Sequence, residues 1–217
     1  MTEKEFRTVY PLVVDWIQKT LAEHATAAVT VASLGFSRLP HYYDETTLVS
    51  AKVISVSRVP VPPLSAMGLD RFKDFERMDM AGITYLDTYF VRAEHVHDES
   101  LHFHELVHVI QWWLLGPEKF LEFYADGLER FGYRNSPLEA MAYNLQDKFD
   151  REAQPFNVEA ACQSLIQDLT SSRGHTSIPR PRQWFLTGYS SAIQAAAGFA
   201  VMDFPKRLPA LIANCRI

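Results

Sequence analysis

Two histidines and a glutamate between Leu101 and Leu115 are the residues of this sequence best suited to chemistry. His104, Glu105 and His108 form the pattern H-E-x-x-H. Residues four apart on a helix lie one above the other, so both imidazole rings can reach one point while the glutamate projects beside them. Zinc sites use this spacing for two neutral nitrogen ligands and a free glutamate that acts as a general base. The spacing therefore predicts a metal site.

The rest of this segment predicts a buried helix. Its apolar residues recur at three- and four-residue intervals: Phe103, Leu106, Val107, Ile110, Trp113 and Leu114. Burying two imidazoles and a carboxylate without a partner is costly, and a metal ion is the simplest partner. The alternative is a polar cluster that hydrogen bonds alone satisfy, in which case the motif is accidental.

A catalytic zinc ion usually has three protein ligands. The longer pattern H-E-x-x-H-x-x-G-x-x-H is absent, because Gln111 and Trp112 occupy the interval of its glycine and no histidine follows. No cysteine is nearby. The third ligand is therefore expected to be a carboxylate from a second helix.

Several carboxylates follow the motif helix, which is expected to end at Gly116. A helix opening at Pro137 carries Glu139 in its first turn, where the returning chain can face the two histidines. Glu139 is the preferred third ligand. Three acids on the intervening helix are the alternatives: Glu118, Glu122 and Glu129.

These residues resemble a known family. His104-Glu105-x-x-His108 followed by Glu139-x-x-Ala142 is similar to the gluzincin branch of the zincin metallopeptidases, and most similar to minigluzincins and related bacterial zincin-like families. The resemblance spans about residues 82–149. It implies a zincin-like fold, zinc ligation by His104, His108 and Glu139, and Glu105 as the catalytic base.

One position departs from this family. Many gluzincins have an aspartate four positions after the ligand glutamate, where this chain has Tyr143. Catalysis would also require a donor for the developing oxyanion. Tyr133, Asn135 and Tyr143 are the candidates for that donor.

Other histidines are expected to lie outside the site. His95 and His97 precede the motif helix, and His102 points about 200° away from His104 on a regular helix. His24 is expected on an exposed helix face. His175 lies in a segment expected to be a linker.

Composition excludes several classes of partner. At 217 residues, with 47% hydrophobic residues, the chain can fill one substantial core. The net charge of −5 and the lack of a basic run argue against a nucleic-acid partner. We expect no membrane span and no secretory signal, hence a cytoplasmic protein. Cys162 and Cys215 form no C-x-x-C pair, which argues against a disulfide framework and a cysteine metal site.

Hydrophobic periodicity predicts an α+β fold. Residues 3–31 predict a helix interrupted or kinked at Pro11, 47–59 a strand, 67–78 a short helix, and 82–92 another strand. An edge strand beside an active-site helix can pair with an extended peptide. We expect a small mixed or antiparallel sheet whose edge strand lies over the HExxH helix, packed with several further helices.

The chain is expected to divide into three parts. Residues 1–169 would form the zincin-like metallohydrolase domain and end in a helix over 157–169. Residues 170–183, which contain two prolines, predict a linker. Residues 184–217 predict a C-terminal helical extension.

The expected function is a zinc-dependent metallopeptidase that holds one Zn²⁺ per chain and acts on a peptide or protein substrate. The first alternative is a zincin-like protein whose metal is structural or regulatory and which binds a partner without peptidase activity. The second is a metal-free helical binding protein.

Overall fold

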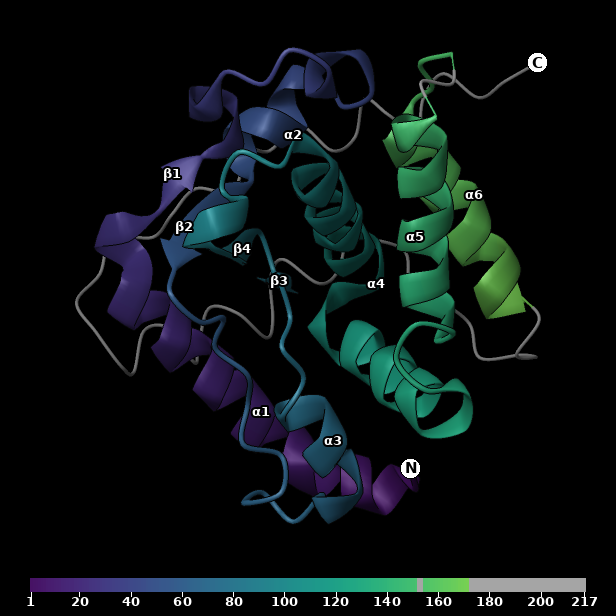
Figure 1. Ribbon diagram of the computed structural model, residues 1–217. Coiled ribbons are helices and arrows are strands. Elements are labelled where there is room, and N and C mark those ends of the chain that lie inside the picture. Colours follow the sequence, from purple (N-terminus) through teal and green to yellow (C-terminus); the bar gives the residue numbers. More distant parts are fainter. Residues whose placement is uncertain (152–153, 172–217) are drawn as a thin grey trace, which may run out of the picture. The chain divides into compact units, whose positions relative to one another are not determined.

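The computed structural model describes residues 1–151 and 154–171 (Figure 1). Helices and a small sheet together confirm the expected α+β class. The elements are α1 (Glu3–His24), η1 (Ala25–Ala27), β1 (Val29–Thr30), η2 (Val31–Leu34), η3 (Leu39–His41), α2 (Glu45–Ser50), β2 (Lys52–Val56), η4 (Asp70–Phe72), α3 (Lys73–Glu76), β3 (Gly82–Tyr85), β4 (Thr88–Arg92), η5 (Ala93–His95), α4 (Glu99–Phe131), α5 (Pro137–Asp150) and α6 (Val158–Ser171).

The four strands form a mixed sheet in the order β1-β2-β4-β3. β2 pairs with β1 antiparallel and with β4 parallel, while β3 and β4 pair antiparallel. The prediction of one strand over residues 82–92 is wrong, because the chain turns back between Tyr85 and Thr88. Leu86 makes this turn with a φ of 61°. Of the two hairpin strands, β3 lies at one edge of the sheet, and β1 forms the other edge.

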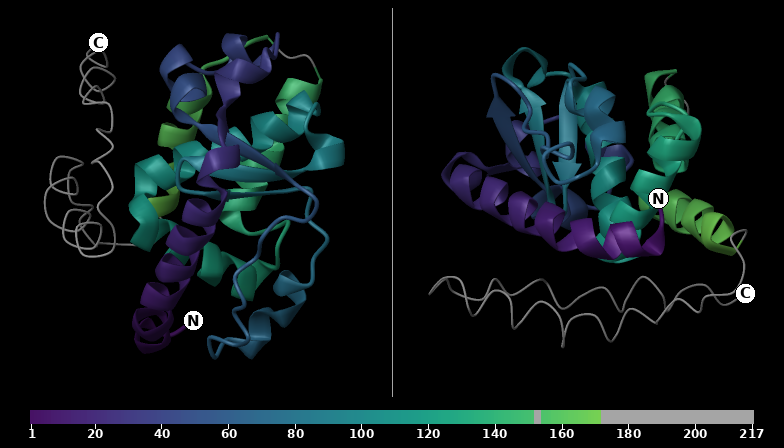
Figure 2. Two further views of the ribbon diagram at one scale, coloured as in Figure 1. Left: turned by 90° about the vertical axis from the view of Figure 1, so that its left-hand side faces the viewer. Right: turned by 90° about the horizontal axis from the view of Figure 1, so that it is seen from below.

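The two faces of the sheet are covered by different helices. Tyr89 donates its hydroxyl proton to Nδ1 of His102 on α4 over 2.6 Å. The next residue, Phe90, points the opposite way, as pleating requires, and its ring centroid lies 5.2 Å from that of His24 on α1. Thus α4 covers one face and α1 the other, while α5 and α6 pack on the side of α4 away from the sheet (Figures 1 and 2).

The helix that carries the motif begins and ends where its sequence predicts. Asp98 caps it by accepting hydrogen bonds from the backbone N–H groups of Ser100 and Leu101. Gly116 breaks it with φ 72° and ψ 164°, and a second helical segment of α4 runs on from Pro117. The left-handed φ favours glycine because it has no Cβ. The two halves of α4 can therefore take different directions.

Three further predictions need correction. The chain from Glu45 to Ser50 is helical, so the strand expected from residue 47 begins only at Lys52. The short helix expected over 67–78 is reduced to η4 and α3. α1 runs through Pro11 as one helix and ends at His24, short of residue 31.

The C-terminal part of the described chain is α6, which ends at Ser171. It corresponds to the helix expected over 157–169. The remainder of the expected linker from residue 172, His175 within it, and the expected extension over 184–217 lie outside the described residues. In the described residues, none of the helices has the length and apolar character to cross a membrane.

Candidate metal centre

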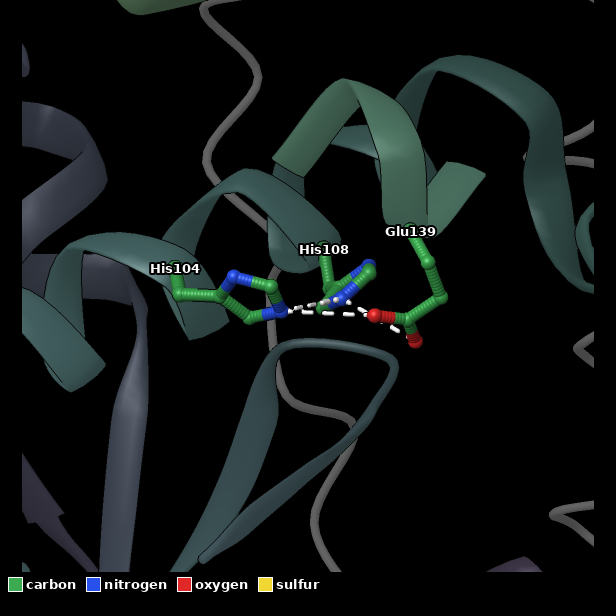
Figure 3. Close-up of side chains that lie close together, drawn as sticks. All are labelled: His104, His108 and Glu139. Carbon is green, nitrogen blue, oxygen red and sulfur yellow. Dashed lines mark hydrogen bonds and ion pairs between the residues drawn. The ribbon is translucent and has the colours of Figure 1, made fainter. Parts of the chain in front are cut away.

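His104, His108 and Glu139 meet at one buried point. The two histidines lie one turn apart on α4, and Glu139 comes from the first turn of α5. Figure 3 shows the two rings and the carboxylate converging from these two helices. The His104, His108 and Glu139 side chains are grouped closely enough to hold a metal ion. Their exposed fractions are only 4%, 5% and 2%.

The spacing of the donor atoms suits a tetrahedral ion. The two Nε2 atoms of His104 and His108 lie 3.1 Å apart. Oε2 of Glu139 lies 3.4 Å from Nε2 of His104, and Oε1 lies 3.5 Å from Nε2 of His108. A tetrahedral zinc ion with ligand bonds of about 2.0–2.1 Å requires its donors to be about 3.3 Å apart. The two nitrogens are therefore close to the spacing that one ion needs, and the Glu139 carboxylate offers one oxygen near each of them.

Two glutamines fix the orientation of the rings. Nδ1 of His108 lies 2.8 Å from Oε1 of Gln111, and Nδ1 of His104 lies 3.0 Å from Oε1 of Gln146. Gln111 donates its amide N–H to the carbonyl of Leu138, and Gln146 donates to Oγ of Ser100. Each amide oxygen therefore faces a ring and accepts a hydrogen bond from its Nδ1–H group. A ring that carries a single proton, on Nδ1, presents a bare Nε2 atom to the centre, and this is the tautomer that a metal requires.

The Glu139 carboxylate is anchored through one oxygen. Tyr124 donates its hydroxyl proton to Oε1 over 2.7 Å, whereas Oε2 has no hydrogen-bond partner although it is buried. Burial alone would raise the pKa of Glu139, but His108 and His104 beside it lower the pKa well below its usual range. The carboxylate is therefore charged, and Oε2 is available as a ligand atom.

His108 experiences the converse effect. Burial lowers its pKa, but the adjacent Glu139 carboxylate outweighs burial and raises the pKa to about 9. A positive charge is thus favoured at this point. In the metal-free protein a proton supplies it.

Glu105 lies beside the centre and does not belong to the group of three side chains that could hold the ion. Its Oε2 accepts a hydrogen bond from the hydroxyl group of Thr84 on β3 over 2.6 Å. Burial raises the pKa of Glu105, and the histidines only partly oppose this. Gly82 adjoins the same carboxylate, since a Cβ on Gly82 would lie 2.9 Å from Cδ of Glu105. The edge strand therefore holds Glu105 in place.

The alternative acids do not reach this point. Glu118 is exposed, Glu122 is paired with Lys119 over 3.0 Å, and Glu129 is paired with Arg71 over 3.1 Å. Among the candidate acids, the structure brings only Glu139 to the histidines.

The other histidines lie apart from the centre. His102 is buried and directs Nε2 to the Val96 carbonyl over 2.9 Å, which matches the expected direction away from His104. His97 is exposed, and His95 is only partly buried. His24 is partly buried and not exposed as expected, because its ring packs against Phe90 of β4.

Of the three candidate oxyanion donors, two lie at the centre. Tyr133 lines a cavity together with His108 and Glu139. Tyr143 packs its ring on His104, with centroids 4.6 Å apart. Asn135 is exposed. Burial raises the pKa of Tyr133, which therefore keeps its proton and can act as a donor.

Four residues at the centre were not identified from the sequence: Thr84, Gln111, Tyr124 and Gln146. Two had a signal. Gln111 lies three residues after His108, and Gln146 lies two turns after Glu139, so each shares a helix face with a site residue. The sequence gives no such indication for Thr84 and Tyr124, because tertiary packing alone brings these two residues to the centre.

Comparison with protein-family models, with curated proteins and with solved structures found no match to this chain.

Proposed function

We propose that this chain is a zinc-dependent metallopeptidase of the gluzincin type. The observation that carries the proposal is the pair of Nε2 atoms 3.1 Å apart, each of which has one oxygen of the Glu139 carboxylate at 3.4–3.5 Å, while Nδ1 of each ring is hydrogen-bonded to a glutamine. The edge strand β3 beside the motif helix also agrees with a zincin-like fold. Two imidazoles and a carboxylate favour zinc over other common divalent ions.

The proposed ligands are His104, His108 and Glu139, which would hold one zinc ion per chain. A zinc ion bound by three protein ligands lowers the pKa of a water molecule and polarises a carbonyl group. The residues around the ion must then manage the proton and the developing negative charge.

Glu105 is the proposed general base. Burial raises the pKa of its carboxyl group, which brings that pKa closer to neutrality and suits a group that both takes and returns a proton. Thr84 holds one of its oxygens by a hydrogen bond, so the carboxylate keeps a fixed orientation. Glu105 would accept a proton from the attacking water and deliver it to the leaving amine.

Tyr133 is the proposed donor to the oxyanion. It lines the cavity at the centre and remains protonated because burial raises its pKa. A hydrogen bond to the oxygen that becomes negative would lower the energy of the transition state. Tyr143 contacts the ring of His104 and is assigned to support that ligand.

The test is the variant Glu105→Gln, compared with Glu118→Gln. Both changes remove one carboxylate from α4, but Glu118 is exposed and takes no part in the centre. We expect about one zinc per chain in both variants by elemental analysis. Peptide cleavage should disappear only in Glu105→Gln. Normal cleavage by Glu105→Gln would refute the proposed mechanism.

One observation favours a second function, a binding protein with a structural or regulatory metal. The ligands and Glu105 are almost completely buried, as in a closed structural site. This function predicts that the wild-type protein binds zinc but cleaves no member of a broad peptide library. Chelation should then lower the melting temperature without any change in hydrolysis.

A further inference from the structure

The turn between α4 and α5 brings an arginine, Arg134, to the metal centre. Gly132 ends α4 with φ 73°, and the backbone N–H of Ser136 donates to the Tyr133 carbonyl over 3.1 Å. Within this turn the side chain of Tyr133 lines the cavity at the centre. The next residue, Arg134, places its guanidinium carbon 4.5 Å from the centroid of the Tyr143 ring. Two adjacent side chains therefore reach different parts of the centre.

Tyr143 connects the charge of Arg134 to a proposed metal ligand. The ring of Tyr143 is partly buried, and its centroid lies 4.6 Å from that of the His104 ring. Burial raises the pKa of Tyr143, and the positive charge of Arg134 acts against this rise, as a cation beside the ring must. Two short contacts thus lead from the guanidinium to His104.

The guanidinium of Arg134 is available to a ligand. Arg134 is exposed, and in the part of the chain that the structure describes no carboxylate is paired with it. A cation–π contact leaves the N–H donors at the edge of a guanidinium free. Arg130 differs, because it lies over the Phe131 ring but is also paired with Asp126 over 3.4 Å.

The chemistry of a guanidinium identifies the group that it would bind. Its planar array of N–H donors matches the two oxygens of a carboxylate, whereas an amide oxygen offers a weaker, uncharged acceptor. The anionic groups of an unmodified peptide are all carboxylates, either of an acidic side chain or of the C-terminus. The contact of Tyr143 with Arg134 holds the guanidinium on the His104 side of the centre, where such a group can meet it.

We propose that Arg134, held against Tyr143, binds a carboxylate of the peptide substrate near the scissile bond. Arg134 would determine specificity and take no part in the chemical step. The inference rests on the proposed peptidase function, since it names acidic peptides as the class of substrate for the same site.

The first arm of the test measures cleavage. Peptides of one sequence with an amidated C-terminus carry glutamate, glutamine or lysine at each position in turn, and a second set has a free C-terminus. The kcat/KM values are measured for the wild type, for Arg134→Gln and for the matched control Arg130→Gln. Both variants lose one exposed arginine from the same end of the α4 and α5 pair. Circular dichroism and zinc content check that both variants fold.

In the wild type, glutamate at one position, or the free C-terminus, should raise kcat/KM about fivefold or more over the uncharged form. Lysine should be poorest, and high salt should reduce the difference. Arg134→Gln should abolish the preference and leave cleavage of the uncharged peptide unchanged, while Arg130→Gln keeps the preference. A preference that persists in Arg134→Gln would overturn the assignment.

The second arm measures binding without catalysis. Chelator-treated protein is used, so that a carboxylate cannot bind zinc, and it is titrated with N-acetylglutamate amide or N-acetylglutamine amide. The NMR signals of the Arg134 and Arg130 Nε–H groups are followed. The acidic compound alone should shift the Arg134 signal and leave that of Arg130 in place. Equal shifts at both arginines would overturn the carboxylate site.

The two arms separate the two proposals. Cleavage without any preference for a carboxylate would overturn the role of Arg134 and leave the peptidase. A shift confined to Arg134, with no peptide cleaved, would overturn the peptidase and leave a carboxylate-binding site beside the metal centre.

Discussion

Zinc binding to the centre is expected to depend on pH through His108. In the metal-free protein, burial lowers the pKa of this ring, but the Glu139 carboxylate outweighs burial and raises it to about 9. Nδ1 donates to Gln111, so the additional proton sits on Nε2 between the ring and the carboxylate. Zinc needs the lone pair of that same Nε2. The proton must therefore leave when the metal binds.

The size of the effect follows from the pKa. At pH 7 the proton competes with zinc across about two pH units, so the apparent affinity should be about 100-fold weaker than above pH 9. Titration calorimetry at pH 7, in two buffers of different ionisation enthalpy, should report about one proton released per zinc ion. Affinity should rise about tenfold per pH unit between pH 7 and 9. No proton release, together with an affinity that does not change over this range, would refute the assigned ring geometry.

The same proton should affect the stability of the metal-free protein. A pKa of about 9 in the folded chain, against 6.5 ordinarily, means that the folded state binds the proton more tightly. The stabilisation is therefore complete below pH 6.5 and is lost as the pH rises through 9, on the order of 3 kcal/mol. Urea unfolding with chelator at pH 6 and 9.5 measures it. His108→Asn should remove most of this difference, and an unchanged difference would assign it to other groups.

Three substitutions give further predictions. Gly82→Ala should displace the Glu105 carboxylate, because the new Cβ would lie 2.9 Å from Cδ of Glu105. We expect kcat to fall about 100-fold at normal zinc content, and an unchanged kcat would contradict this. Gln146→Leu removes the acceptor of His104 Nδ1 and should weaken zinc binding about 10- to 100-fold in a chelator competition, whereas the exposed Lys148→Leu should not. Gly116→Ala meets no atom within 4 Å, so its cost in denaturant unfolding should be backbone strain alone, about 1–3 kcal/mol.

The motif helix and its partner could be predicted because their signals are local. Asp98 and Gly116 mark the ends of one regular helix, and within it the spacing of His104 and His108 fixes which face they share. The choice of Glu139 as the third ligand was based on the length of the intervening chain and on the direction of the returning helix. Helix α5 returns along α4, so an acid in its first turn reaches the histidines.

The sheet was harder to predict because a tertiary contact or an unusual residue determines its boundaries. Leu86 turns the β3–β4 hairpin at positive φ, a place where glycine or asparagine is the usual signal. Thr47 is β-branched and suggested a strand, yet its hydroxyl donates to Glu159 of α6 over 2.7 Å from within α2. No short window of sequence contains that contact.

Burial of the centre helps to decide between a metal site and a polar cluster without one. A cluster satisfied by hydrogen bonds alone would leave no buried polar atom unpaired. Here Oε2 of Glu139 has no hydrogen-bond partner. The Nε2 atoms of His104 and His108 face each other 3.1 Å apart, while Nδ1 of each ring is hydrogen-bonded to a glutamine. A single proton between the two Nε2 atoms can satisfy both rings through one hydrogen bond, but it leaves Oε2 of Glu139 without a hydrogen bond. One divalent cation satisfies both rings and the carboxylate at once, so the arrangement of Gln111 and Gln146 behind the rings is explained best by a metal.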